Sequence, residues 1–140
     1  MKNTPDISAS IDLLVQFYHL DPMEIVWHGN YSKFLEDARC ELLNKIGYNY
    51  EEMRTSGYAW PIVDMRIKYV KPAVFQQRLL IVASLKEYEN RLVIDYRIRD
   101  HDTGEHLTKA QTKQVAVHIE TGEMQFQSPD ILINKVEEFT

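Results

Sequence analysis

The residues best suited to chemistry gather in one segment of the chain, between Tyr18 and Tyr31. This segment holds the carboxylate of Asp21, followed at once by a proline, and the imidazoles of His19 and His28. Carboxylates and imidazoles can transfer protons, and a carboxylate can also attack a carbonyl carbon. Taken alone, however, an Asp-Pro pair often only ends a strand in a turn, and a histidine there often only hydrogen-bonds to the backbone. The residue types therefore mark a candidate site and leave its role open.

The rest of the sequence excludes several other kinds of site. The chain has 5 glycines and contains none of the patterns G-x-x-x-x-G-K-[ST], G-x-G-x-x-G or G-x-S-x-G, so we expect neither a phosphate-binding loop nor a serine-hydrolase elbow. The five histidines include no H-x-x-x-H pair and Cys40 is the only cysteine, so we predict no metal site. A single cysteine also forbids an intrachain disulfide and fits a reducing compartment.

The composition is typical of one acidic globular domain. In 140 residues, 16 Lys and Arg face 21 Asp and Glu, which gives a formal net charge of −5 and argues against a nucleic-acid-binding surface. The longest unbroken apolar run, residues 79–83, is far shorter than the roughly 20 residues of a membrane-spanning helix. The N-terminal stretch MKNTPDISAS lacks the apolar region of a secretory signal, so we expect a cytoplasmic protein without a membrane span.

The elements that must position the candidate segment begin with a long helix. Apolar residues recur with helical spacing from Tyr31 to Ile46, Asn30 suits the N-cap, and Gly47 follows as a stop signal. Before the helix, an apolar and aromatic run indicates a strand. The predicted elements up to this point are a flexible N-terminal arm over residues 1–10, a strand over about 12–19, the helix over 31–46 and a helical turn over about 50–56.

Beyond Gly57 the apolar residues alternate with polar ones, which is typical of strands. The last long strand carries small residues on one face, among them Thr108 and Ala110, which would let the long helix approach closely. One strand, one long helix and then four or five antiparallel strands make an α+β fold, in which an antiparallel sheet wraps around one central helix in a single domain over residues 11–140. The predicted strands cover residues of about 64–69, 78–88, 92–99 and 105–119, and an amphipathic segment follows to about 139.

The segment between the first strand and the long helix resembles the signature loop of a known enzyme family. It reads Asp21-Pro22-x-x-Ile25-Val26-Trp27-His28-x-Asn30-Tyr31, which is similar to the loop of the hotdog-fold acyl-CoA thioesterases typified by 4-hydroxybenzoyl-CoA thioesterase and the YbgC-type enzymes. The runs Glu36-Asp37-Ala38-Arg39 and Lys71-Pro72-Ala73 also match that family. The resemblance extends over about residues 11–135 and implies the hotdog fold.

The resemblance also implies an activity, the hydrolysis of an acyl-CoA or acyl carrier protein thioester to a free acid and a thiol. Asp21 matches the catalytic aspartate, which acts as the nucleophile or as the general base for water. The main-chain amides at the helix start, around His28 and Gly29, match the donors that polarise the thioester oxygen. Two family positions differ here, because His19 replaces an acidic residue and Glu24 replaces a glycine.

Further residues are candidates for binding the substrate, and the resemblance implies partners as well. The family needs no metal and no organic cofactor, since coenzyme A is part of the substrate. Its site forms between protomers, with the loop of one chain facing the helix start of the other, so we expect a homodimer that can pair into a homotetramer. The candidate walls of the acyl pocket are Trp27, Asn30, Tyr31, Pro61, Ile62 and Val63. The candidate contacts to the phosphates of coenzyme A are Arg66, Lys68, Lys71, Arg97 and Arg99.

Two other functions remain open at this point. A hotdog dehydratase or hydratase acting on acyl thioesters would use a histidine and a helix carboxylate, which His28 with Glu36 or Glu41 could supply, although the proline-rich loop that follows the histidine in those enzymes is missing. A related thioesterase branch also uses a helix carboxylate, which would give Glu36 the working role. A non-catalytic acyl-thioester binding module is the third reading, and the replacements at His19 and Glu24 keep it open.

Overall fold

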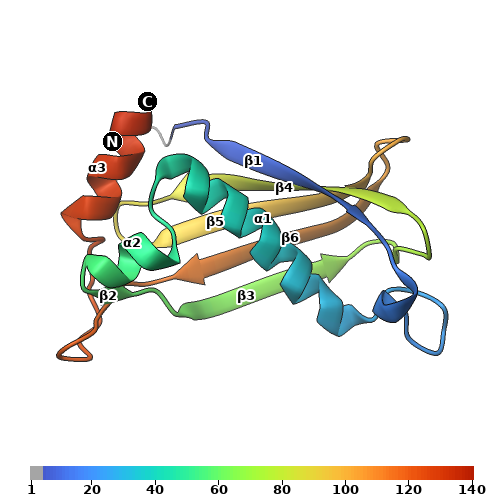
Figure 1. The fold of residues 1–140 in the computed structure, drawn as a ribbon, viewed down its shortest axis with the longest axis horizontal. Coiled ribbons are helices and arrows are strands. Elements are labelled where there is room, and N and C mark those ends of the chain that lie inside the picture. Colours follow the sequence, from blue (N-terminus) through green and yellow to red (C-terminus); the bar gives the residue numbers. More distant parts are fainter. Residues whose placement is uncertain (1–4) are drawn as a thin grey trace.

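The long helix α1 (Tyr31–Ile46) lies across one face of a curved antiparallel sheet in the computed structural model, which describes residues 5–140 (Figure 1). The helix predicted from the apolar spacing is confirmed. Its apolar stripe is buried, and Phe34, Leu35 and Leu42 are each at most 2% exposed. Gly47 ends the helix with a φ of 76°, a left-handed conformation that glycine adopts without strain.

Five strands form the main sheet in the order β1-β4-β5-β6-β3, and every neighbouring pair is antiparallel. This arrangement confirms the predicted α+β architecture of one sheet wrapped around one helix. The five strands are β1 (Ser8–Leu14), β3 (Ile62–Tyr69), β4 (Arg78–Glu87), β5 (Leu92–Asp100) and β6 (His106–Gln114). The other elements are a small antiparallel pair of β2 (Tyr58–Ala59) with β7 (Val117–His118), the helices α2 (Tyr50–Thr55) and α3 (Asp130–Phe139), and 3-10 turns at Phe17–His19 and His28–Asn30. Within residues 5–140, no helix is long and apolar enough to cross a membrane.

The N-terminal strand begins earlier than the sequence predicted. We expected an arm over residues 1–10 and a strand over about 12–19, but Ser8–Ser10 already belong to β1, which pairs with β4 along its whole length. Residues 1–4 of the expected arm lie outside the described residues. The aromatic run that looked like strand is a 3-10 turn in which Phe17 and Tyr18 are exposed, whereas the weaker alternation of Ala9 with its neighbours forms the real strand.

The helix does not cover the whole sheet. The backbone of α1 lies nearest to β1 and β4, and not to β6, where the small residues Thr108 and Ala110 led us to expect a close approach of the helix. They are buried all the same. The side chains of Met65 and Tyr69 on β3 share their face of the sheet but remain 38% and 47% exposed. The edge strand β3 therefore presents apolar groups that nothing in the described chain covers.

Candidate active site

Asp21 lies at the base of a short hairpin formed by residues 20–26. Leu20 and Val26 form an antiparallel bridge, and the Asp21 N–H donates to the Ile25 carbonyl oxygen at 2.9 Å. Asp21 Oδ1 accepts a hydrogen bond from the Met23 N–H at 2.8 Å. The loop itself therefore orients the half-buried carboxylate, and the other carboxylate oxygen, Oδ2, has no hydrogen-bond partner among the described residues.

The turn of this hairpin is strained at Glu24, the position at which the loop's resemblance to the hotdog thioesterases led us to expect a glycine. The φ of Glu24 is 65°, in the left-handed region that costs a non-glycine residue about 1–3 kcal/mol. The Glu24 N–H closes the turn by donating to the Asp21 carbonyl oxygen at 2.9 Å. The backbone thus keeps a conformation that favours glycine, while the Glu24 side chain is exposed to solvent.

The segment before β4 holds this hairpin from the other side. The Val26 N–H donates to the Ala73 carbonyl oxygen at 2.9 Å, and Ile25 forms a bridge with Val74. The Ala73 N–H in turn donates to the hydroxyl of Tyr31 at 3.3 Å. Burial raises the pKa of Tyr31, which keeps the hydroxyl neutral. Tyr31 is 2% exposed and supports the loop from within the core.

Asn30 connects the hairpin to the start of α1. Its side-chain Nδ2 donates to the His19 carbonyl oxygen at 2.8 Å, and the same oxygen accepts from the Trp27 N–H at 2.9 Å. Asn30 stands at the predicted N-cap position of α1, but its side chain makes no capping hydrogen bond, because it has helical dihedral angles as the last residue of the 3-10 turn that leads into the helix. Its buried amide instead fixes the distance between the Asp21 loop and the helix start.

The imidazole of His19 supports the same loop in its neutral form. His19 Nδ1 accepts a hydrogen bond from the Gln16 N–H at 2.9 Å, which requires that Nδ1 is unprotonated. The ring packs edge-on against Phe34, with centroids 5.1 Å apart. Burial lowers the pKa of His19, and the nearby charge of Lys33 lowers it further. The residue two positions before Asp21 is therefore a neutral structural group at pH 7.

The start of α1 presents main-chain donors. The 3-10 turn His28–Asn30 leads directly into α1, and the N–H groups of His28 and Gly29 have no acceptor among the described residues. The His28 carbonyl oxygen accepts from the Tyr69 hydroxyl at 3.1 Å, while the imidazole is exposed. A Cβ on Gly29 would lie 2.4 Å from the Trp27 ring, so only glycine lets the indole rest on this turn. Two aligned N–H groups at a helix N-terminus can stabilise developing negative charge.

The structure brings together Asp21, Trp27, His28, Gly29, Asn30 and Tyr31, but not the other predicted pocket walls. Pro61, Ile62 and Val63 lie exposed where β3 begins, at the opposite end of that strand from Tyr69. Since Tyr69 is the residue that contacts His28, one chain alone keeps these two groups apart.

A row of cations crosses the outer face of the sheet. Lys68 on β3 lies opposite Lys109 on β6, which in turn lies opposite Arg97 on β5. These three side chains line a hollow of about 700 Å³, and Arg66 joins them around an adjoining hollow of about 360 Å³. Cations placed directly opposite one another repel, so an anion bound here would stabilise the sheet. Lys109 was not among the predicted contacts, although it alternates with the other outward-facing residues of its strand.

The two remaining predicted cations lie outside these hollows. Lys71 forms an ion pair with Glu105, with Nζ 3.0 Å from the carboxylate. Arg99 lies opposite His106 and is half-buried. His106 lines the larger hollow at its edge, together with Tyr69.

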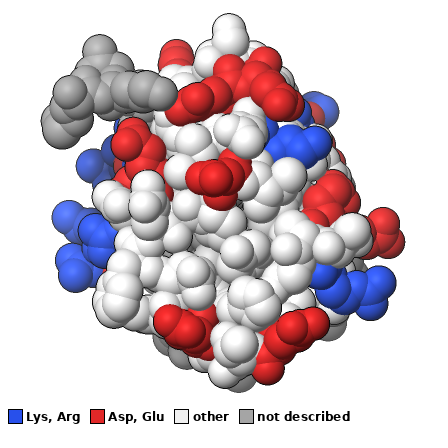
Figure 2. Space-filling view, turned by 90° about the vertical axis from the view of Figure 1, so that its left-hand side faces the viewer, with Lys and Arg blue, Asp and Glu red and all other residues white. Residues whose placement is uncertain are grey.

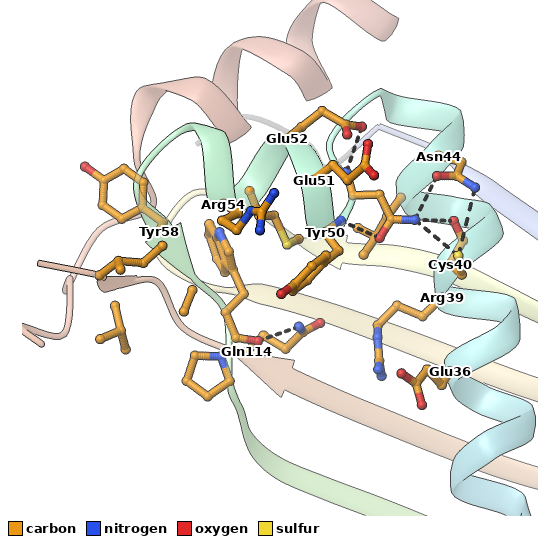
Figure 3. Close-up of a pocket in the computed structure, with 18 of the residues that line it drawn as sticks. Glu36, Arg39, Cys40, Asn44, Tyr50, Glu51, Glu52, Arg54, Tyr58 and Gln114 are labelled. Carbon is orange, nitrogen blue, oxygen red and sulfur yellow. Dashed lines mark hydrogen bonds between the residues drawn. The ribbon is translucent and has the colours of Figure 1, made fainter.

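A cavity of about 1060 Å³ opens between the C-terminal half of α1, α2 and β2 (Figure 3). Its wall includes Pro61, one of the predicted pocket residues, and the apolar side chains of Leu43, Met53 and Trp60. Gln114 at the end of β6 also lines it, and so does Arg39 of α1. Sequence reasoning missed Gln114, and it noted Arg39 only as part of a run that matches the family, because the two residues are far apart in the chain.

Comparison with known proteins shows the family and the fold. A family model described as Thioesterase-like superfamily matches residues 15–136. YneP of Bacillus subtilis, whose name marks it as a candidate acyl-CoA thioesterase, is 29% identical over 111 residues, covering 79% of this chain and 80% of that protein. A candidate esterase of Aquifex aeolicus is 31% identical over 104 residues, covering 74% of this chain and 80% of the relative. The crystal structure of a 1,4-dihydroxy-2-naphthoyl-CoA thioesterase from Synechocystis has the same fold, with a TM-score of 0.82 at 19% identity over 94% of this chain and 96% of that one.

Proposed function

This chain belongs to the thioesterase-like superfamily, and on that basis we propose that it hydrolyses acyl-CoA thioesters to a free acid and coenzyme A without a metal or organic cofactor. One observation carries the proposal. The Asp21 carboxylate sits on a hairpin that Asn30 and Trp27 tie to the unpaired N–H groups of the helix start. Acyl transfer requires an anionic group and an oxyanion site in fixed positions, and here one chain holds both, whereas the family resemblance led us to expect them on two chains.

Asp21 has two possible roles in the reaction. As a nucleophile, its carboxylate attacks the thioester carbon, the C–S bond breaks, coenzyme A leaves as a thiolate, and water then hydrolyses the acyl–aspartate anhydride. As a general base, it takes a proton from a water molecule whose oxygen attacks the same carbon, and the departing thiolate receives that proton. In both, the N–H groups of His28 and Gly29 stabilise the oxyanion that forms on the carbonyl oxygen.

The cation row on the outer face suits the nucleotide end of the same substrate. Coenzyme A carries several phosphate charges, and Lys68, Lys109 and Arg97 are adjacent in the sheet. One carboxylate, Asp95, lines the adjoining hollow with them and accepts a hydrogen bond from Gln111. Tyr69 borders this hollow and also contacts His28, so the hollow lies at the same end of β3 as the helix start. A carrier-protein thioester would present its phosphate to the same groups.

The exposed edge strand supports a homodimer, which could pair again into a tetramer. β3 is the last strand of the sheet, and Ile62, Val63 and Met65 on it are 36%, 57% and 38% exposed. An exposed apolar edge favours pairing with another strand. If two copies of β3 pair antiparallel, the Tyr69 end of one protomer lies beside the Pro61 end of the other. The Asp21 loop of one chain would then face the 1060 Å³ cavity of its partner, which unites the two groups of predicted residues.

Release of free thiol from a panel of short, long and aromatic acyl-CoA substrates tests the proposal. In Asp21→Asn the amide oxygen can still accept from the Met23 N–H, so the hairpin is preserved while the carboxylate is lost. We expect the turnover rate to fall by about 100-fold or more. Asp102→Asn, at a side chain that is 76% exposed, is the matched control and should keep the wild-type rate.

Three outcomes would contradict the proposal. Full activity of Asp21→Asn would refute the role of its carboxylate. Absence of thiol release from every substrate would favour a binding module, and loss or gain of a double bond without thiol release would favour a dehydratase or hydratase.

A further inference from the structure

The cavity between α1, α2 and β2 has an apolar wall interrupted by a polar corner. Leu43, Met53, Trp60 and Pro61 supply much of the apolar surface. Gln114 from β6 and Arg39 from α1 point into the same space, as Figure 3 shows. No part of the proposed hydrolysis uses either side chain.

The amide of Gln114 has a fixed orientation and an unmet acceptor. The residue is only 5% exposed. Its Nε2 donates to the Trp60 carbonyl oxygen at 2.8 Å, so Oε1 must point the other way, into the cavity. Oε1 is buried and has no hydrogen-bond donor among residues 5–140. A buried acceptor without a donor is costly, and a ligand that supplies one would be bound selectively.

The guanidinium of Arg39 offers the complementary group. Its Nη1 is buried and has no acceptor within the described chain. Burial raises the pKa of Tyr96, and this rise is partly offset by a hydrogen bond with Thr112 and by Arg39, through its charge and a hydrogen bond to the Tyr96 hydroxyl. Arg39 and Gln114 line the same cavity, and Thr112 lies two residues before Gln114 on the same strand. The corner therefore lacks one donor, at Gln114, and one acceptor, at Arg39.

The charges around the cavity decide which group could meet both needs. Glu36, Asp37, Glu51 and Glu52 line it against Arg39 and Arg54, so carboxylates outnumber guanidinium groups. Figure 2, which faces the end of the molecule with α2, β2 and α3, shows acidic groups on a largely uncharged surface and basic groups mostly toward its margins. A carboxylate would also be repelled by Gln114 Oε1. A neutral hydroxyl group both donates and accepts, and it matches the corner.

We propose that Gln114 and Arg39 select acyl groups that carry a hydroxyl group at a distance from the thioester, the hydroxyl donating to Gln114 Oε1 and accepting from Arg39 Nη1. This inference rests on the proposed function, since it assigns the cavity to the acyl part of the thioester. It adds two specificity residues that lie outside the catalytic loop.

Binding and turnover of matched pairs of probes test the inference with the full-length chain. One pair is benzoyl-CoA and 4-hydroxybenzoyl-CoA, and the other is octanoyl-CoA and 8-hydroxyoctanoyl-CoA, each also made as a thioether analogue that cannot be hydrolysed. At least one pair should show about tenfold tighter binding and higher kcat/KM for the hydroxylated member. An octanedioyl thioether, which ends in a carboxylate, should bind no better than the octanoyl one.

Two variants remove the partners one at a time. Gln114→Met removes the acceptor, and Arg39→Met removes the donor without disturbing the bond between Gln114 and Trp60. In each variant the affinity for the hydroxylated member should become about equal to that for the unsubstituted member of the same pair. The affinity for the unsubstituted member itself should change by less than about threefold. Gln127→Met, at an exposed glutamine, is the control and should keep the wild-type ratio.

The outcomes separate this inference from the proposed function. Equal binding of both members of both pairs by the wild-type protein overturns the inference, and so does a ratio that survives in both variants. Discrimination between the thioethers without hydrolysis of any thioester would support the inference and overturn the proposed function. Hydrolysis of the thioesters without discrimination within either pair would support the proposed function and overturn the inference.

Discussion

Asn30 is the residue whose replacement should separate the geometry of the site from its chemistry. It lies outside the reacting groups, but its buried amide bonds to the His19 carbonyl oxygen at 2.8 Å and thereby ties the Asp21 hairpin to α1. In Asn30→Ala this bond is lost. In Asn30→Asp the side chain keeps its shape but turns a carboxylate oxygen toward the same carbonyl oxygen, so the tie becomes a repulsion.

The expected loss in the free energy of unfolding depends on which hydrogen bonds the His19 carbonyl oxygen keeps in each variant. A buried hydrogen bond contributes about 0.5–1.5 kcal/mol. The His19 carbonyl oxygen keeps its bond from the Trp27 N–H, so Asn30→Ala leaves no acceptor wholly unpaired, and we expect the free energy of unfolding to fall by about 1–2 kcal/mol with the lost packing. For Asn30→Asp we expect a larger loss, about 2–3 kcal/mol, since a charged group is then buried beside an acceptor.

The activity should respond more strongly than the stability. A shift of about 1 Å between the carboxylate of Asp21 and the N–H groups of the helix start can cost about 100-fold in rate. We therefore expect kcat/KM to fall about 10- to 100-fold in both variants. The assay is run at a temperature at which both variants are folded, as checked by urea unfolding followed by circular dichroism. Asn134→Ala, at an exposed asparagine of α3, controls for the loss of an amide. Wild-type activity and stability in Asn30→Asp would show that the tie has no role.

Two further predictions concern the same turn. Gly29→Ala should destabilise the fold by about 1–3 kcal/mol and lower activity, because the new Cβ would lie 2.4 Å from the Trp27 ring. This loss of stability, measured by urea unfolding, should vanish when Trp27→Ala is made in the same chain. An equal loss with and without Trp27→Ala would contradict the contact. The lowered pKa of His19 means that its neutral form is favoured in the folded chain, so this contribution to stability is complete above pH 6.5, the ordinary value, and is lost as the pH falls through the lower folded value. His19→Asn, which keeps an acceptor for the Gln16 N–H but does not titrate, should flatten the decline in unfolding free energy between pH 7 and pH 5 relative to wild type; an unchanged slope would assign the decline to other groups.

Local patterns predicted the elements and residues whose structure depends on near neighbours. The apolar spacing from Tyr31 to Ile46 specifies a helix because each turn repeats the same face. Gly47 ends the helix because it adopts a left-handed backbone conformation, which glycine does without strain. The loop around Asp21 was predicted from a run of consecutive residues, and these residues do bond mainly to one another.

Long-range contacts could not be predicted in the same way. The strand β1 was misplaced because its start depends on its pairing with β4, 76 residues away at the Ser8–Ser84 pair, and not on its own apolar content. The residue type of Asn30 correctly predicted its N-cap position, but it could not predict that the side chain makes no capping bond and instead donates to the carbonyl oxygen of His19, 11 residues earlier. The polar corner of the cavity joins Arg39 of a helix to Gln114 of the last long strand, and only the packing of α1 on the sheet brings them together.

The two faces of the sheet divide the proposed substrate according to its chemistry. The outer face gathers Lys68, Lys109 and Arg97, which suit the phosphates, and the inner face bears the cavity that suits the acyl group. A thioester must pass from one face to the other, and β3 is the edge around which it can do so. Tyr69 stands at the end of that edge, beside the cation hollow, with its hydroxyl on the His28 carbonyl oxygen. In the proposed homodimer we place the scissile bond beside Tyr69, where the helix start of one protomer would face the cavity of the other. The net charge of −5 does not oppose this proposal, because the anionic half of the substrate would meet a local row of cations.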